Sequence, residues 1–158
     1  MQTKVELRTS FRARRRALSS LEQQCAAQAV LEIILRENLL ANKQHIACYQ
    51  TRDGELDTAP LIAYLQQAHK NIYFPQVLPD DTLVFSHAPD LVFVPLVAFD
   101  RKGNRLGMGK GCYDRTFSAQ SVPLIGLAHA CQEADVLPVD EWDVPLKAII
   151  TNEEYITH

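Results

Sequence analysis

LVFVPLVAFDRKGNRLGMGKGCYDR, residues 91 to 115, begins with an apolar run and ends in a glycine-rich loop. The run Leu91–Val94 is too short for a helix and is rich in β-branched and aromatic residues, so it predicts a buried strand. Pro95 has no N–H to give to a sheet, so we expect the strand to end near it. A second short apolar piece, residues 96–99, then leads to Asp100.

The loop after this strand holds four of the six glycines of the chain within nine residues, Gly103, Gly107, Gly109 and Gly111. The alternate spacing of the last three allows the backbone to turn and expose successive N–H groups, because no Cβ stands in the way. Such N–H groups form an anion site, especially where a helix starts directly after them. We expect that helix to begin near Gly111, because no helix breaker follows before Pro123.

Charged side chains surround the same loop. Arg105 and Lys110 add positive charge, and Asp100 and Asp114 offer carboxylates that could hold the magnesium ion of a polyphosphate. The loop is not a Walker loop, since no G-K-[ST] ends it, and its third glycine comes too early for the usual dinucleotide fingerprint. An ordinary turn is the alternative, because a short G-x-G pattern is weak evidence by itself.

The composition indicates a single globular domain, residues 1–158. Hydrophobic residues make up 47% of the chain and charged residues 22%, and the net charge of −3 argues against nucleic acid binding by bulk charge. Cys25, Cys48, Cys112 and Cys131 show no C-x-x-C spacing, so we expect reduced thiols in a cytoplasmic protein. No apolar segment approaches the ~20 residues of a membrane helix, so we expect no membrane association.

Predicted helices and strands alternate along the chain. The expected helices cover residues 3–18, the segment from a Ser19–Glu22 capping box to about Leu40, a segment that Asp57 or Thr58 caps with Pro60 in its first turn, and the segment after Gly111. The expected strands cover residues 45–49, 71–75, 82–86, 91–94, 122–128 and 148–151. This alternation predicts an α/β three-layer sandwich with a mostly parallel central sheet flanked by helices, and ligands at the carboxyl ends of its strands.

The stretch from residue 94 to residue 115 resembles the signature of the 5-formyltetrahydrofolate cyclo-ligase family, also called methenyltetrahydrofolate synthetases. The family pattern is approximately V-P-x-x-A-F-D-x-x-G-x-R-L-G-x-G-x-G-Y-Y-D-R. This chain matches it at Val94-Pro95, Ala98-Phe99-Asp100, Gly103, Arg105-Leu106-Gly107, Gly109, Gly111 and Tyr113-Asp114-Arg115. Cys112 is the one clear departure, because the family usually has an aromatic residue there.

Motifs outside this stretch extend the resemblance to both ends of the chain. The family's K-x-x-x-R is matched by Lys4 and Arg8, and its Y-x-S-x-x-x-E-[VIL]-x-T is matched from Tyr49 to Thr58, with Thr51 in place of the serine. The segment LPVDEWDVP, residues 137–145, is similar to the family's L-P-x-E-x-x-D, and the final I-I-T is residues 149–151.

The resemblance implies an enzyme that uses ATP to cyclise 5-formyltetrahydrofolate to 5,10-methenyltetrahydrofolate, with release of ADP and phosphate after phosphorylation of the formyl oxygen. It implies ATP and Mg²⁺ as ligands and a small-molecule folate substrate, with or without a polyglutamate tail, and we expect a monomer. The implied ATP-binding residues are Lys4, Arg8, Arg105, Leu106, Gly107, Met108, Gly109, Lys110, Gly111, Cys112 and Tyr113. The implied substrate-binding residues are Gln50, Glu55, Met108 and Tyr113, the catalytic residues Arg105 and Tyr113, and the magnesium ligands Asp114 and Asp143.

The chain departs from the family between Phe85 and Leu91. Only Ser86-His87-Ala88-Pro89-Asp90 stands where members have a longer segment, with a Glu-Pro loop that lines the folate site. Two alternatives therefore stay open. A non-catalytic nucleotide- or folate-binding relative would bind Mg-ATP without turnover, and an enzyme for another carboxylate or amide would hydrolyse ATP in response to a different compound.

Overall fold

A six-stranded sheet forms the centre of the computed structural model, which describes residues 1–158. The strand order is β10-β9-β8-β5-β1-β2, and every neighbouring pair is parallel except β9 with β10. The strands are β1 (His45–Ala47), β2 (Asn71–Tyr73), β5 (Leu91–Pro95), β8 (Leu124–Leu127), β9 (Ala148–Ile150) and β10 (Tyr155–Thr157). The predicted α/β sandwich with a mostly parallel sheet is confirmed.

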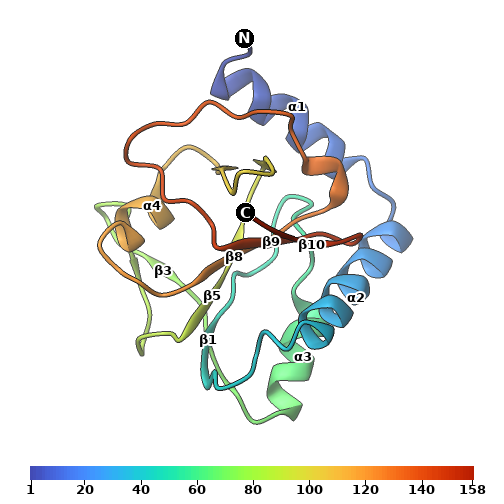
Figure 1. The fold of residues 1–158 in the computed structure, drawn as a ribbon, viewed down its shortest axis with the longest axis vertical. Helices are drawn as coiled ribbons and strands as arrows, with labels where there is room; N and C mark the ends of the chain where they lie inside the picture. The colour runs from blue at the N-terminus through green and yellow to red at the C-terminus, as the bar shows by residue number, and fades with distance from the viewer.

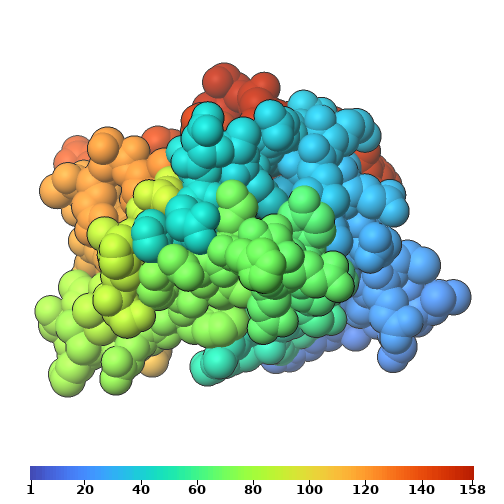
Figure 2. All heavy atoms as spheres, turned by 90° about the horizontal axis from the view of Figure 1, so that it is seen from below, coloured from blue at the N-terminus to red at the C-terminus, as the bar shows by residue number.

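Alternating side chains of the central strands enter two separate cores. Leu91 and Phe93 of β5 belong to a cluster of 18 buried residues on one face, whereas Val92 and Val94 belong to a cluster of 11 on the other. Helices α2 (Ser20–Arg36) and α3 (Ala59–Gln67) cover the first face, where Figure 2 shows them in light blue and green. The short helix α4 (Cys112–Phe117) covers part of the opposite face (Figure 1) through Phe117.

The predicted capping box of α2 is confirmed, but the predicted end of this helix is wrong. The Ser19 side chain accepts a hydrogen bond from the Glu22 N–H, and the Glu22 carboxylate accepts one from the Ser19 N–H. The helix ends at Arg36 rather than near Leu40, because the backbone at Asn38 is left-handed with φ of 54°. Leu40 is buried in the core from a turn that follows the helix.

Two small hairpins and one strand were not anticipated. The expected strand 82–86 is only β4 (Leu83–Val84), and it pairs with β3 (Gln76–Val77) in a separate two-stranded sheet. β6 (Ala98–Phe99) and β7 (Arg105–Leu106) form a second hairpin. The first part of the glycine-rich stretch is therefore a strand, which lies between Gly103 and Gly107. The edge strand β10 pairs antiparallel with β9.

Helix α1 (Lys4–Arg16) lies apart from the two helices of the first face, at the top of Figure 1. Its buried residues Leu7 and Phe11 pack in a third, smaller cluster with residues of β6 and β7 and of the segment that follows η1 (Ala130–Gln132). α1 therefore rests on the segments that leave the carboxyl ends of β5 and β8. No helix is long and apolar enough to cross a lipid bilayer.

The sheet topology places a crevice between β1 and β5. From β1 the chain continues through α3 to β2 on one side, whereas from β5 it continues to β8 on the other side. The loops after these two neighbouring strands therefore separate, and ligands of open α/β sheets bind where such loops diverge. Residues 48–58 and residues 96–111 form the two sides of this opening.

Candidate active site

A cavity of about 350 Å³ lies at the carboxyl ends of the strands, beneath the first half of α1. Its lining includes Lys4, Arg8 and Glu55, the continuous run from Arg105 to Asp114, and Asp143. Every candidate site residue from the sequence is thus found in one cavity, except Gln50, which is exposed outside this lining, and Asp100. Residues separated by more than a hundred positions in the chain meet there.

The glycine-rich loop presents unused backbone donors to the cavity. No hydrogen bond within the protein has a backbone N–H of residues 107–111 as its donor. Gly109 and Gly111 have φ values of 108° and 68°, which side chains rarely adopt. The Arg8 Nε donates to the Gly107 carbonyl oxygen at 2.8 Å, and a Cβ on Gly109 would lie 3.3 Å from the Arg8 guanidinium carbon. The loop thus resembles an anion-binding site, and Arg8 of α1 lies against it.

Arg105 is a buried cation whose Nε has no hydrogen-bond partner. Its side chain is 6% exposed, and its Nη2 donates to Asp114 Oδ1 at 3.1 Å. The guanidinium carbon lies 5.5 Å from the centre of the Tyr113 ring, whereas the buried Nε has no hydrogen-bond partner. A buried donor left without a partner is costly, so this atom is suited to an anionic ligand. Burial raises the pKa of Tyr113, so its hydroxyl stays protonated in the working pH range.

Lys4 is held by two carboxylates at the opposite side of the cavity. Its Nζ lies 2.6 Å from Asp140 Oδ2 and 3.0 Å from Asp143 Oδ2. Burial opposes its charge, but the hydrogen bonds to Asp140 and Asp143 outweigh this and raise the pKa of Lys4. The ammonium is therefore positively charged and must leave these partners, or share them, to contact a phosphate.

Asp114 and Asp143 fit a magnesium ion that arrives with a polyphosphate. Each uses one carboxylate oxygen in hydrogen bonds, Asp114 Oδ1 with the Val144 N–H and Asp143 Oδ2 with the Asp140 N–H, and the other oxygen has none. The protein has no cluster of three or more side chains that could hold a metal alone. Mg²⁺ needs only one or two carboxylates when phosphates and waters complete its shell, so the two free oxygens suit it.

The proposed metal role of Asp100 is wrong. This carboxyl group is 1% exposed and accepts hydrogen bonds from the backbone N–H groups of Lys102, Asn104 and Leu137. It also accepts one from the Asn104 side chain. Asp100 therefore shapes the turn between β6 and β7 and lies outside the cavity.

Glu55 reaches the cavity from the loop after β1. The Tyr49 hydroxyl donates to the Leu56 carbonyl at 2.6 Å, and the Thr58 hydroxyl donates to the Tyr49 carbonyl at 3.1 Å. Thr51 replaces a serine of the motif but still accepts from the Thr58 N–H through its hydroxyl. These contacts close the loop on itself and explain the spacing of the Tyr and Thr positions.

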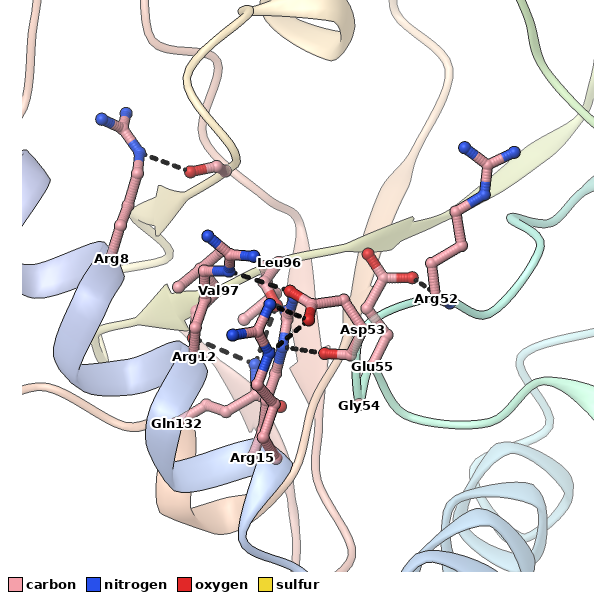
Figure 3. Close-up of polar contacts among 12 residues, drawn as sticks. Arg8, Arg12, Arg15, Arg52, Asp53, Gly54, Glu55, Leu96, Val97 and Gln132 are labelled. Atoms are coloured by element: carbon pink, nitrogen blue, oxygen red, sulfur yellow. Dashed lines mark hydrogen bonds and ion pairs between the residues drawn. The ribbon is translucent and has the colours of Figure 1, made fainter.

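The Glu55 carboxylate is partly withdrawn from water. Its Oε2 accepts a hydrogen bond of 3.0 Å from the Arg52 N–H (Figure 3), and its other oxygen has no partner in the protein. Burial raises the pKa of Glu55 above its ordinary value, against the lowering effect of the Arg52 hydrogen bond. A half-buried carboxylate with a free oxygen is suited to a ligand that offers parallel N–H donors.

A sequence model of the 5-formyltetrahydrofolate cyclo-ligase family matches residues 1–89 and 82–152. The chain belongs to this family. The two matches overlap at residues 82–89, where the sequence lacks the longer central segment of the family pattern. Both halves of the cyclo-ligase pattern are therefore present, and they meet at the shortened segment.

Relatives named as cyclo-ligases cover nearly the whole chain. The 5-formyltetrahydrofolate cyclo-ligase of Haemophilus influenzae is 38% identical over 184 residues, which cover 94% of this chain and 97% of that protein. The enzyme of the same name from Escherichia coli K12 is 36% identical over 174 residues, covering 89% and 96%. Both alignments are longer than the 158 residues of this chain, so they place gaps in it.

A cyclo-ligase structure of similar extent comes from Mycoplasma pneumoniae. This protein, described as a 5,10-methenyltetrahydrofolate synthetase, superposes with a TM-score of 0.86 at 28% identity and covers 96% of this chain and 99% of its own. The synthetase of Aquifex aeolicus gives a TM-score of 0.84 at 26% identity, covering 99% and 93%. A chain without the long central segment is therefore compatible with the cyclo-ligase fold.

Five cavity residues were not selected from the sequence. Asp140 and Trp142 stand in the LPVDEWDVP segment, from which only Asp143 was selected. Pro95, Leu96 and Val97 line the cavity at the end of β5 and directly after it. The position of Leu96 at a strand end was a signal that could have found it, whereas the pairing of Asp140 with Lys4 depends on a contact across 136 positions.

Proposed function

We propose that this chain closes the ring of 5-formyltetrahydrofolate to give 5,10-methenyltetrahydrofolate, with conversion of ATP to ADP and phosphate. One observation carries the proposal: a cavity combines unused N–H donors and four cations with a separate, half-buried carboxylate. The first group suits a polyphosphate, and the second suits a pterin. The names of the relatives support the same reaction.

The chemistry requires activation of a poor leaving group. The oxygen of a formamide does not leave readily, so its attack on the γ-phosphorus of ATP, with ADP as the leaving group, first converts it to a phosphate ester of the imidate. N10 of the folate then attacks the formyl carbon and loses its proton to solvent, and inorganic phosphate leaves with the former formyl oxygen. Phosphoryl transfer depends mainly on positioning and on neutralising charge, so a protein nucleophile is not required.

The cations and the glycine loop would bind the phosphates. Lys4 and Arg8 lie one helical turn apart on α1 and line the same cavity as Arg105. The free N–H groups of residues 107–111 supply further donors without any reorganisation at the moment of transfer. The Arg105 Nε would gain its missing acceptor from the transferring phosphoryl group, which assigns this residue a catalytic role.

Asp114 and Asp143 would hold a magnesium ion directly or through water, and the ion would neutralise phosphate charge. Occupation of the free Asp143 oxygen would reduce the hold of this carboxylate on Lys4. Lys4 would then be available to a phosphate oxygen. The two acidic residues, the lysine and the ion would thus act as one electrostatically coupled group.

Glu55 would orient the folate by accepting from the N3–H and 2-amino groups of the pterin. These two donors are parallel and match the two oxygens of a carboxylate. Met108 and Tyr113 line the same cavity and would contact the substrate and the transferring group. The protonated Tyr113 hydroxyl is a donor that can stabilise developing charge.

The deciding experiment mixes purified protein with Mg-ATP and 5-formyltetrahydrofolate and follows the methenyl chromophore at acidic pH. A sample without ATP and an Arg105→Gln variant are the controls. We expect ATP-dependent growth in the unchanged protein and its loss in the variant. Binding of Mg-ATP without any product would contradict the proposal and favour a non-catalytic relative, whereas ATP hydrolysis driven only by another compound would indicate a different substrate.

A further inference from the structure

One face of α1 contacts three loops of the cavity in succession. Lys4 pairs with the 140–143 segment, and Arg8 donates to the glycine loop at Gly107. Arg12 and Arg15, further along the helix, both reach Asp53 in the loop that carries Glu55. Residues at intervals of three and four lie on one side of a helix, so a single rigid element connects the phosphate side to the folate side.

Arg15 makes the most enclosed of these contacts. The residue has 0% exposure, and its Nε and Nη2 donate to the Asp53 carbonyl and to Asp53 Oδ2 at 2.8 and 3.0 Å. Its Nη1 donates to the Leu96 carbonyl at 2.9 Å (Figure 3). The same guanidinium therefore joins the loop after β1 to the end of β5, across the crevice between these strands.

Both partners of Arg15 are adjacent to the cavity. Asp53 precedes Glu55 by two residues, and Leu96 lines the cavity itself. The Leu96 carbonyl also accepts from the fully buried Gln132 side chain at 2.8 Å, which fixes it from the side of η1. A displacement of Arg15 would therefore move the support of Glu55 and one wall of the cavity together.

The backbone of the Glu55 loop is built around this contact. Asp53 has a left-handed φ of 53°, and Gly54 follows with φ of 74°. A Cβ on Gly54 would lie 3.2 Å from the Arg15 carbonyl oxygen, so the loop approaches the helix backbone closely. Burial works against the Asp53 charge, but hydrogen bonds from Arg12, Arg15 and Arg16 lower its pKa to about 2. The carboxylate therefore stays ionised and bound at any working pH.

We propose that Arg15, through Asp53 and the Leu96 carbonyl, is a positioning residue that holds Glu55 at a fixed place relative to the phosphate-binding side chains of α1. The inference rests on the proposed function, because it treats Glu55 as the folate-orienting carboxylate. A buried ion pair contributes little net stability compared with apolar packing. The planar fork of an arginine, however, fixes two partners in direction as well as in distance.

The test compares Arg15→Lys, Arg15→Met and Asp53→Asn with the unchanged protein. Arg16→Gln is the matched control, because Arg16 pairs with the same Asp53 carboxylate but its side chain is 52% exposed and reaches neither Leu96 nor the cavity. The measurements are kcat and the KM values for both substrates, together with amide hydrogen exchange of residues 50–56 and 107–111. Thermal unfolding identifies any variant that fails to fold.

We expect the KM for 5-formyltetrahydrofolate to rise about ten- to a hundredfold in the Arg15 and Asp53 variants, as small misplacements of a binding group do. The KM for Mg-ATP should stay within about twofold, and exchange should increase at residues 50–56 but not at 107–111. Arg16→Gln should leave all of these values near those of the unchanged protein. If Arg15→Met does not fold, Arg15→Lys and Asp53→Asn decide the question.

Two results would overturn the inference. One is a folded Arg15→Lys variant whose unfolding temperature falls while the folate KM stays unchanged, which would leave Arg15 a structural residue only. The other is an equal rise in both KM values, or equal exchange in both loops. A protein with no cyclo-ligase activity at all would instead refute the proposed function, and the exchange measurement would still decide whether Arg15 orders the Glu55 loop.

Discussion

Replacement of Glu55 by glutamine tests the folate side of the cavity. The glutamine side chain keeps the size of the glutamate but has one carbonyl oxygen and one NH₂ group. The oxygen can still accept from one pterin donor, whereas the NH₂ group would face the second donor. Because the position is half-buried, water cannot fully replace the lost acceptor for this second pterin donor.

The loss follows from the value of one hydrogen bond to a charged group. Such a bond contributes about 1.5–3 kcal/mol, which corresponds to a change of about 10- to 150-fold in an equilibrium constant. We therefore expect the folate KM of Glu55→Gln to rise within this range. Mg-ATP binding should change little, because the one hydrogen bond of Glu55 is with the Arg52 N–H, and Glu55 has none with Lys4, Arg8, Arg105 or the glycine loop.

The pH dependence gives a second and independent measurement. Burial raises the pKa of Glu55, so the carboxylate is protonated at a higher pH than an ordinary glutamate. On acidification, kcat/KM for the folate should therefore begin to fall at a correspondingly higher pH. This descent should be absent in Glu55→Gln. For the ligand-free protein, the effect of pH on stability has the opposite sign. The folded state disfavours the ionised form of Glu55, so its pKa is higher in the folded state than in the unfolded state. Stability is therefore lost as the pH rises through the folded-state pKa.

Glu55→Gln should therefore unfold at an equal or higher temperature than the unchanged protein at neutral pH, while it binds folate less well. Steady-state kinetics from pH 5 to 8 and thermal unfolding by circular dichroism measure the two effects. A folate KM within twofold of the original, with the acidic descent still present, would refute the role given to this carboxylate.

Other substitutions probe the nucleotide side and the core. Asp140→Asn removes a carboxylate that competes for Lys4 in a partly exposed pair, so Mg-ATP should bind more tightly, by up to about fivefold. Lys4→Gln should weaken Mg-ATP binding. Fluorescence of Trp142, the only tryptophan, can measure the Mg-ATP affinity of both variants. A change of affinity in the same direction in both variants would contradict the proposed competition of Asp140 for Lys4. Gly126→Ala places a Cβ 2.7 Å from Leu96 and 2.8 Å from Leu146 inside the core. Overpacking of this kind costs about 1–3 kcal/mol, so a thermal unfolding temperature within a degree of the original would show that the core can adjust.

The elements that the sequence predicted are those with local causes. Buried strand β5 follows from its apolar run, and the start of α2 follows from the Ser19 and Glu22 side chains, which bond to each other's backbone. The positive φ values of Gly109 and Gly111 follow from the glycine spacing in the same way. Each depends on neighbours within a few positions of the chain.

The features that the sequence did not predict depend on distant contacts. Leu40 is buried from a turn that follows α2 rather than from the helix, and β10 pairs with the edge that β9 offers. Asp100 shows the limit for a site residue: a carboxylate beside a glycine-rich loop can bind a metal or bind the N–H groups of the loop. The Asp100 carboxylate does the second, through the N–H groups of Lys102 and Asn104. Its further contact with the Leu137 N–H, 37 residues away, depends on the fold and could not be predicted from the neighbouring residues.

The attachment of α1 has a consequence for how the protein responds to its ligands. Only Leu7, Phe11 and Arg15 of its thirteen residues are buried, and its remaining attachments are side-chain bonds to loops. The sheet with α2 and α3 has a separate core, so detachment of α1 would leave that core intact. A triphosphate that bridges Lys4, Arg8 and the glycine loop would bind only the attached form. Nucleotide binding and the attachment of α1 would then be thermodynamically linked, so that each favours the other.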